Sequence, residues 1–222
     1  MGWFSSACSF VGSCISGAAS IVSSAVSSLG SLSGVVGSFL KVASPYLSTI
    51  MSVVQVVSQL LGILQPNETP EELGDKALNA DKKLEDFDTT QEYMEYLREE
   101  VDFDKEAFDK LSDEEKLARS AIGTVISMKA INEHKGFEVT LDTWTSMAKL
   151  YEKNILNKES VDGFIDEFKE NQSELNAYVN KEIKGAKGVE VAGKMAQAYQ
   201  KLEPTLSADE INNKVLNSKI GE

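Results

Sequence analysis

The first 67 residues of the chain distribute apolar and small polar positions with the period of an α-helix. Apolar side chains recur at spacings of three and four from Phe4 to Val36, and serines occupy the opposite face, within a sector about 100° wide. Those serines are Ser5, Ser6, Ser9, Ser13, Ser16, Ser20, Ser23, Ser24, Ser27 and Ser31. The pattern therefore predicts an amphipathic helical arm whose polar face consists of hydroxyl groups instead of charges.

A second arm follows Pro45 and runs from Tyr46 to Gln65 before Pro66 closes it. At 1.5 Å per residue, a helix of this length would span a hydrocarbon core of about 30 Å. Its uncharged polar residues, at spacings of four, three and four, again form one stripe. The two arms predict a helical hairpin with its turn at Lys41 and Pro45. Gly30 and Gly34 favour a break within the first arm, although the same spacing also permits close contact between two helices.

The distribution of charged residues also changes close to Pro66, where the second arm ends. Residues 1 to 67 contain a single charged side chain, Lys41, so the remaining 155 residues carry 21 of the 22 Lys and Arg and all 35 Asp and Glu. We therefore predict an all-α protein with two parts, a membrane-active hairpin over residues 1–66 and an acidic helical domain over residues 67–222. The acidic part repels nucleic acid, and no basic stripe offsets it, so nucleic-acid binding is not expected.

The two faces of the hairpin predict two roles in a bilayer. A serine returns its hydrogen bond to the carbonyl four residues earlier, so it crosses hydrocarbon at far lower cost than a charged residue. The candidate pore-lining residues are Ser16, Ser20, Ser23, Ser27, Ser52, Gln55 and Gln59. The candidate membrane-facing residues are Phe4, Val11, Ile15, Ile21, Val22, Leu29, Val54, Val57 and Leu61. The same composition also fits arms buried in a helical bundle beneath the acidic helices, and a bundled hairpin can later be released to a membrane.

Helix-start signals recur along the acidic part. Thr69 to Glu72, Thr89 to Glu92, Ser112 to Glu115 and Ser207 to Glu210 each have the spacing of a capping box, and Gly136 is the expected stop of the helix that begins after Ser112. Apolar positions between these signals have helical spacing and are predicted to be core. They are Tyr93, Tyr96, Leu97, Leu117, Ala121, Ile122, Val125, Ile126, Trp144, Met147, Leu150 and Tyr151.

Residue patterns for catalysis or cofactor binding are missing from the sequence. His134 is the only histidine, and we find no phosphate loop, nucleophile elbow or Cys-x-x-Cys pair. Residues 158–169 resemble a calcium-binding loop, but lysines stand at both ends where carboxylates are needed, so a turn opening into a helix is preferred. We expect no enzyme activity, no cofactor and no metal. Cys8 and Cys14 are too far apart on a helix for a disulfide, and lipidation at Gly2 or Cys8 stays open.

The leading functional hypothesis is a membrane-inserting, pore-forming effector or toxin that acts as a homo-oligomer in the bilayer of a target cell. The layout of the chain resembles that of small pore-forming toxins that bacteria deliver to one another through contractile secretion machines. The start of the chain lacks the basic region of a secretory signal, so a different secretion route is expected. The resemblance implies a delivery tube, chaperone or immunity protein that shields the hairpin.

Two alternative functions would also place the uncharged segment in a membrane. One is a virion protein, of the ejection or minor capsid type, whose N-terminus penetrates a host membrane. The other is a non-toxic, membrane-anchored scaffold that recruits a partner through its acidic helices. Assembly into a ring or shell would favour the first alternative, and stable residence in the producer's own membrane without leakage would favour the second.

Overall fold

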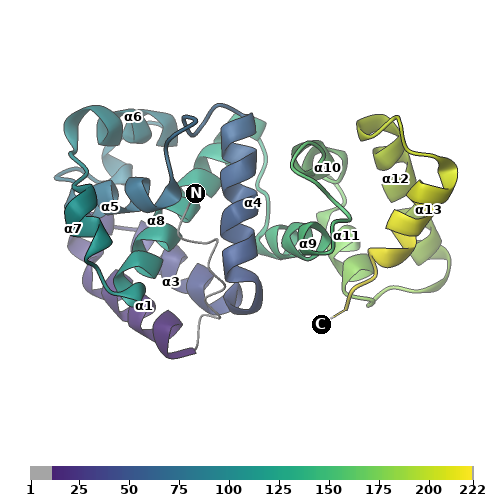
Figure 1. The fold of residues 1–222 in the computed structure, drawn as a ribbon, viewed down its shortest axis with the longest axis horizontal. Coiled ribbons are helices and arrows are strands. Elements are labelled where there is room, and N and C mark those ends of the chain that lie inside the picture. The colour runs from purple at the N-terminus through teal and green to yellow at the C-terminus, as the bar shows by residue number, and fades with distance from the viewer. Residues whose placement is uncertain (1–11, 222) are drawn as a thin grey trace. The chain divides into compact units, whose positions relative to one another are not determined.

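The computed structural model describes residues 12–221, which form helices and connecting turns with no strand among them. The all-α prediction is therefore confirmed. The chain divides into two compact units, with the boundary between Glu138 and Val139. Figure 1 shows the helices of both units. The charge composition changes earlier, at Pro66, so the uncharged segment shares its unit with acidic helices. The functional division predicted at Pro66 stays a prediction.

Unit 1, as described from Gly12 to Glu138, is built around the long helix α8. Its helices are α1 (Gly12–Ser24), α2 (Val26–Leu29), α3 (Leu32–Val42), the 3-10 helix η2 (Ser44–Tyr46), α4 (Leu47–Leu60), α5 (Pro70–Asn79), the 3-10 helix η3 (Leu84–Asp86), α6 (Thr90–Glu100), α7 (Lys105–Asp109) and α8 (Asp113–Lys135). Helix α8 contacts α1, α3, α4, α5 and α6, and it runs among them in Figure 1. The core of this unit is therefore organised around a single helix.

The predicted helix starts and stops in unit 1 are found in the structure. The hydroxyls of Thr69, Thr89 and Ser112 each accept a hydrogen bond from the backbone N–H three residues later, as N-caps do. In α6 and α8 the glutamate at that third position returns the bond and completes the capping box. Gly136 ends α8 with a φ of 70°, a left-handed conformation that glycine adopts without steric cost.

Unit 2, described from Val139 to Gly221, contains the remaining helices. They are α9 (Leu141–Glu152), α10 (Val161–Glu167), α11 (Gln172–Val179), α12 (Gly185–Leu202) and α13 (Ala208–Asn217). Its core includes rings of Phe164, Phe168 and Tyr199, with centroids of Phe164 and Tyr199 5.1 Å apart. The Tyr199 hydroxyl donates to the Ile155 carbonyl at 3.2 Å, and burial raises the pKa of this hydroxyl. Ser207 and Glu210 complete the capping box of α13.

The predicted core positions of the acidic part are buried, except that Tyr96 and Tyr151 are half-buried. Helix α8 is buried on more sides than its apolar face alone predicts, since Ser120, Thr124 and Ser127 are also fully buried. The hydroxyls of Ser120 and Thr124 donate to the carbonyls of Lys116 and Ser120, at 2.8 and 2.7 Å. These internal bonds allow polar residues to lie in the core without partners on other helices.

Candidate functional site

The described part of the uncharged segment, residues 12–67, lies in unit 1 with most of its large apolar side chains buried, whereas Val26, Val35, Val42 and Leu60 are exposed. Of the candidate membrane-facing positions, Ile15, Val22, Leu29, Val54 and Val57 are buried, whereas Ile21 and Leu61 are half-buried. Phe4 and Val11 lie outside the described residues. Burying these side chains against α8 and its neighbours stabilises the bundle by about 1.5–3 kcal/mol for each large aliphatic residue. Their role toward lipid stays a prediction.

The four candidate pore-lining serines of the first arm, Ser16, Ser20, Ser23 and Ser27, are all exposed. Ser16 and Ser23 donate to the carbonyls of Gly12 and Ala19, each at 2.8 Å. The predicted amphipathic pattern therefore has its hydroxyl face outward and its apolar face inward. Because the hydroxyls of Ser16 and Ser23 are already satisfied within the helix, moving these two out of water exposes no unpaired donor.

The first arm is broken, as its glycines favoured. Helix α1 ends at Ser24, the short helix α2 follows, and Gly30 adopts a φ of 55° and a ψ of −129° before α3 begins. This conformation is strained for any residue that has a Cβ atom. The break allows α3 to turn back and contact α1 within the bundle.

The second arm forms a shorter helix than the sequence predicts. Helix α4 ends at Leu60, and Gly62 follows with a φ of 70°. Its fourteen residues give a length of about 21 Å, less than a hydrocarbon core of about 30 Å. Ser52 and Gln55 are half-buried and Gln59 is exposed; Ser52 donates to the Ser48 carbonyl at 3.0 Å.

The predicted hairpin turn is a bend between α3 and α4. Lys41 lies in the last turn of α3 and Pro45 in η2, and both are exposed. The axes of the two flanking parts differ in direction by 78°. No single helix among residues 12–221 has both the length and the apolar composition of a membrane span, whereas α3 and the η2–α4 part meet both criteria together.

The contact between α5 and α8 is much closer than an ordinary side-chain contact. A Cβ atom added to Gly74 would lie 1.8 Å from the Arg119 carbonyl oxygen, and one added to Gly123 would lie 1.8 Å from the Pro70 carbonyl oxygen. Arg119 Nε also donates to Asp75 Oδ1 at 2.6 Å, and both side chains are largely buried. These contacts make α5 and α8 the fixed frame of unit 1.

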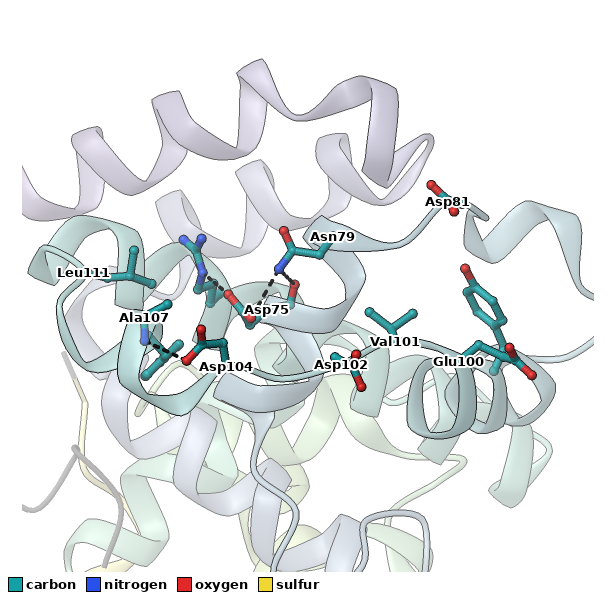
Figure 2. Close-up of a pocket in the computed structure, with 12 residues that line it drawn as sticks. Asp75, Asn79, Asp81, Glu100, Val101, Asp102, Asp104, Ala107 and Leu111 are labelled. Atoms are coloured by element: carbon teal, nitrogen blue, oxygen red, sulfur yellow. Dashed lines mark hydrogen bonds and ion pairs between the residues drawn. The ribbon is translucent and has the colours of Figure 1, made fainter.

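An open pocket of about 460 Å³ lies beside this frame (Figure 2). Five of the twelve residues that line it are acidic: Asp75, Asp81, Glu100, Asp102 and Asp104. Asp75 binds Arg119, and Asp104 accepts from the Ala107 N–H at 3.0 Å as the N-cap of α7. Two of these carboxylates therefore hold helices in place.

Neither the histidine nor the calcium-like loop forms a recognisable site. His134 lies in the last turn of α8, an ordinary position for a basic residue. Within residues 158–169 a turn leads into α10, and Asn157 Oδ1 accepts from the N–H groups of Glu159 and Ser160. Among the described residues, no group of three or more His, Cys, Asp or Glu side chains is placed to hold a metal ion.

Sequence reasoning missed the residues that attach the uncharged segment to the acidic helices. Arg98 Nη2 donates to the Ile63 carbonyl at 2.6 Å and to Glu68 Oε2 at 2.7 Å. Glu85 accepts from Ser31 at the break before α3. One signal pointed to such contacts: the chain has only two arginines beside 20 lysines, Arg98 and Arg119, and arginine is the preferred cation for buried ion pairs.

Comparison of the chain with protein-family models, curated proteins and solved structures finds no match.

Proposed function

We propose that this protein is a membrane-inserting, pore-forming effector that stores its uncharged segment in a helical bundle before reaching a target membrane. The observation that carries the proposal is the composition of residues 12–66, where Lys41 is the only charged side chain. Within this segment α3 and α4 together have the apolar composition of a membrane span. A bundle core needs apolar faces, but it does not need outward faces free of charge as well.

The exposed serines support the pore hypothesis specifically. Soluble helices ordinarily present charged residues to water, whereas α1 presents Ser16, Ser20 and Ser23, and α2 presents Ser27. Several copies that turn these faces toward one another in a bilayer would enclose a narrow path lined by neutral hydroxyls. Such a pore would select ions chiefly by width. The proposed sequence is secretion, release of the segment from unit 1, insertion and oligomerisation in the target-cell membrane.

The central test is ion release from lipid vesicles by the full-length protein. Potassium release without release of a larger dye is expected, because the proposed pore is narrow. A deletion of residues 1–66 is a poor control, since it removes buried residues of the unit 1 core. Point variants in exposed positions are better, because they leave the stored bundle intact. Vesicles that retain both potassium and dye would contradict the proposal.

One pair of aspartate variants and one double serine variant separate insertion from conduction. Val35→Asp places a charge on α3 at a position that is 47% exposed, and Val189→Asp makes the same change at a 72% exposed position of unit 2. An inserted aspartate costs at most about 2.5–3.5 kcal/mol, the value at the middle of a span, and Val189→Asp adds no charge to the segment, so only Val35→Asp should weaken membrane binding. Ser20→Leu combined with Ser27→Leu should abolish potassium release and retain membrane binding. Equal loss of both properties in the serine variant and in Val35→Asp would contradict the pore-lining role.

A further inference from the structure

The segment that has the composition of a membrane span is attached at both of its ends to one short stretch of the acidic part. At the first end, immediately before α3, the Ser31 N–H donates to Glu85 Oε1 and the Ser31 hydroxyl donates to Glu85 Oε2, each at 3.2 Å. Both oxygens of the Glu85 carboxylate therefore accept hydrogen bonds from Ser31. They bind at the N-terminus of α3, where the helix dipole favours a negative charge.

Gly30 makes this attachment possible. A Cβ atom at this position would lie 2.0 Å from Glu85 Oε1, so only glycine leaves room for the carboxylate. The φ of 55° and ψ of −129° at Gly30 turn the chain toward Glu85. The break in the first arm thus also serves as the binding site of Glu85.

The second end of the segment, after α4, is held by Arg98. Its Nη2 atom donates to the Ile63 carbonyl at 2.6 Å, and its Nε and Nη2 atoms contact the carboxylate of Glu68 at 2.7–3.2 Å. The side chains of Arg98 and Glu68 are 17% and 9% exposed. A charge-assisted bond that water reaches poorly is stronger than the same bond on the surface.

Glu85 and Arg98 lie on neighbouring elements, η3 and α6, that pack against each other. The ring of Phe87, just after η3, lies with its centroid 5.5 Å from that of Tyr93 and 5.3 Å from that of Tyr96, both in α6. Glu133 Oε2 accepts from the Thr90 N–H at 2.8 Å, which ties the start of α6 to α8. Residues 85–98 therefore connect both ends of the segment to the central helix.

We propose that residues 85–98 are a clasp that keeps α3, η2 and α4 in the bundle, and that opening of its two contacts is the step that frees the segment for a bilayer. The release step rests on the proposed function, whereas the restraint itself is a property of the folded protein in water. The partner of the clasp is thus a segment of the same chain, and the contacts to be broken are those of Glu85 with Ser31 and of Arg98 with Ile63.

The restraint is tested without lipid, by hydrogen exchange of the full-length protein. Glu85→Ala and Arg98→Met are compared with Glu99→Ala and Lys110→Met, which alter exposed residues of the same charges. Loss of the part-buried Arg98 bonds should raise exchange over residues 32–60 by about tenfold, and loss of the exposed Glu85 bonds should raise it by less. Peptides from residues 117–131 of α8 report global unfolding and should stay protected. Exchange over residues 32–60 equal to that of the controls would overturn the clasp.

A cross-link tests the same contact in the opposite direction, because it holds this end of the segment closed until the linker is cleaved. Ser31→Cys and Glu85→Cys, in a chain with Cys8 and Cys14 changed to Ala, are joined by a short linker that a reductant cleaves. Joined protein should release at least about tenfold less potassium from vesicles than the same protein after reduction, because the clasp can no longer open. Equal release before and after reduction would overturn the release step.

These measurements separate the clasp from the pore. If Glu85→Ala and Arg98→Met raise exchange over residues 32–60 but no form of the protein permeabilises vesicles, the restraint is supported and the proposed function fails. If the unmodified protein permeabilises vesicles and the variants exchange like their controls, the proposed function is supported and the clasp fails.

Discussion

Helices α1 and α8 both carry hydroxyl side chains that donate to their own backbone, yet they lie in opposite environments. Ser16 and Ser23 of α1 are exposed, whereas Ser120 and Thr124 of α8 are fully buried. The same bond to the carbonyl four residues earlier is present in all four residues. A hydroxyl face is therefore compatible with water and with a core, which is the property that a segment moving from one to the other requires.

The largest expected effect comes from adding a charge to each environment. Thr124→Asp places a carboxylate at a fully buried position of unit 1 and should lower the free energy of unfolding by about 4 kcal/mol, because burial removes the charge from water. Ser16→Asp adds the same charge at an exposed position of α1 and should change that free energy by less than about 0.5 kcal/mol. Urea unfolding, with hydrogen exchange to assign the affected unit, measures both. Similar losses of unfolding free energy in the two variants would show that position 16 of α1 tolerates a charge no better than position 124 of α8.

Glycine substitutions should give the next effect. Gly123→Ala places a methyl group against the Pro70 backbone, 1.8 Å from its carbonyl oxygen, and neither backbone can move without separating α5 from α8. We expect a loss of about 3 kcal/mol. Gly17→Ala in α1 meets only the side chain of Glu114, at 2.6 Å, which can rotate away.

For Gly17→Ala the gain in helix propensity, about 1 kcal/mol, should offset the contact. Thermal unfolding of the two variants makes the comparison direct. A larger loss from Gly17→Ala than from Gly123→Ala would contradict the assignment of α5 and α8 as the fixed frame.

The smallest effect concerns pH, because α1 has no carboxylate, whereas the first turn of α8 contains Asp113, Glu114 and Glu115. Hydrogen bonds from the Ser112 backbone and hydroxyl lower the pKa of Glu115 below its ordinary 4.5. A lowered pKa contributes stability that is present above the value in the unfolded chain and is lost as the pH falls through the folded value. Glu115 is exposed to screening, so the loss should be a small fraction of the total.

Exchange protection in the first turns of α8 should therefore fall as the solution is taken from about pH 6 to about pH 3.5, the range that includes ordinary carboxylate titration. Glu115→Gln keeps an acceptor for the capping box and should remove that part of the change. If Glu115→Gln left the pH dependence of exchange protection unaltered, its assignment to Glu115 would be wrong.

Local chemistry made several parts of unit 1 predictable. Thr69, Thr89 and Ser112 begin helices because their hydroxyls bind the N–H groups of a first turn, and Gly136 ends α8 because it adopts a left-handed conformation. Each of these outcomes depends on residues within four positions of one another. The outward serines and inward apolar residues of α1 follow from the helical period in the same way.

Contacts between distant residues were not predictable. Nothing near Gly30 in the sequence points to Glu85, and nothing near Ile63 points to Arg98, since only the folded chain brings them together. The early end of α4 at Leu60 has a local cause instead, since Gly62 adopts a φ of 70° and the Ile63 N–H donates to the Ser58 carbonyl at 2.8 Å. The unit boundary at Glu138 differs from the charge step at Pro66 because burial against α8, and not charge, groups the helices.

The sequence by itself determined that the chain is helical, where most helices of the acidic part begin, and that one uncharged segment has hydroxyl and apolar faces. Only the tertiary structure decided that α8 is the common partner of that segment and that Glu85 and Arg98 hold its two ends. The physical reason is range: caps and helical periods act between neighbouring residues, whereas burial and ion pairs depend on which distant surfaces meet.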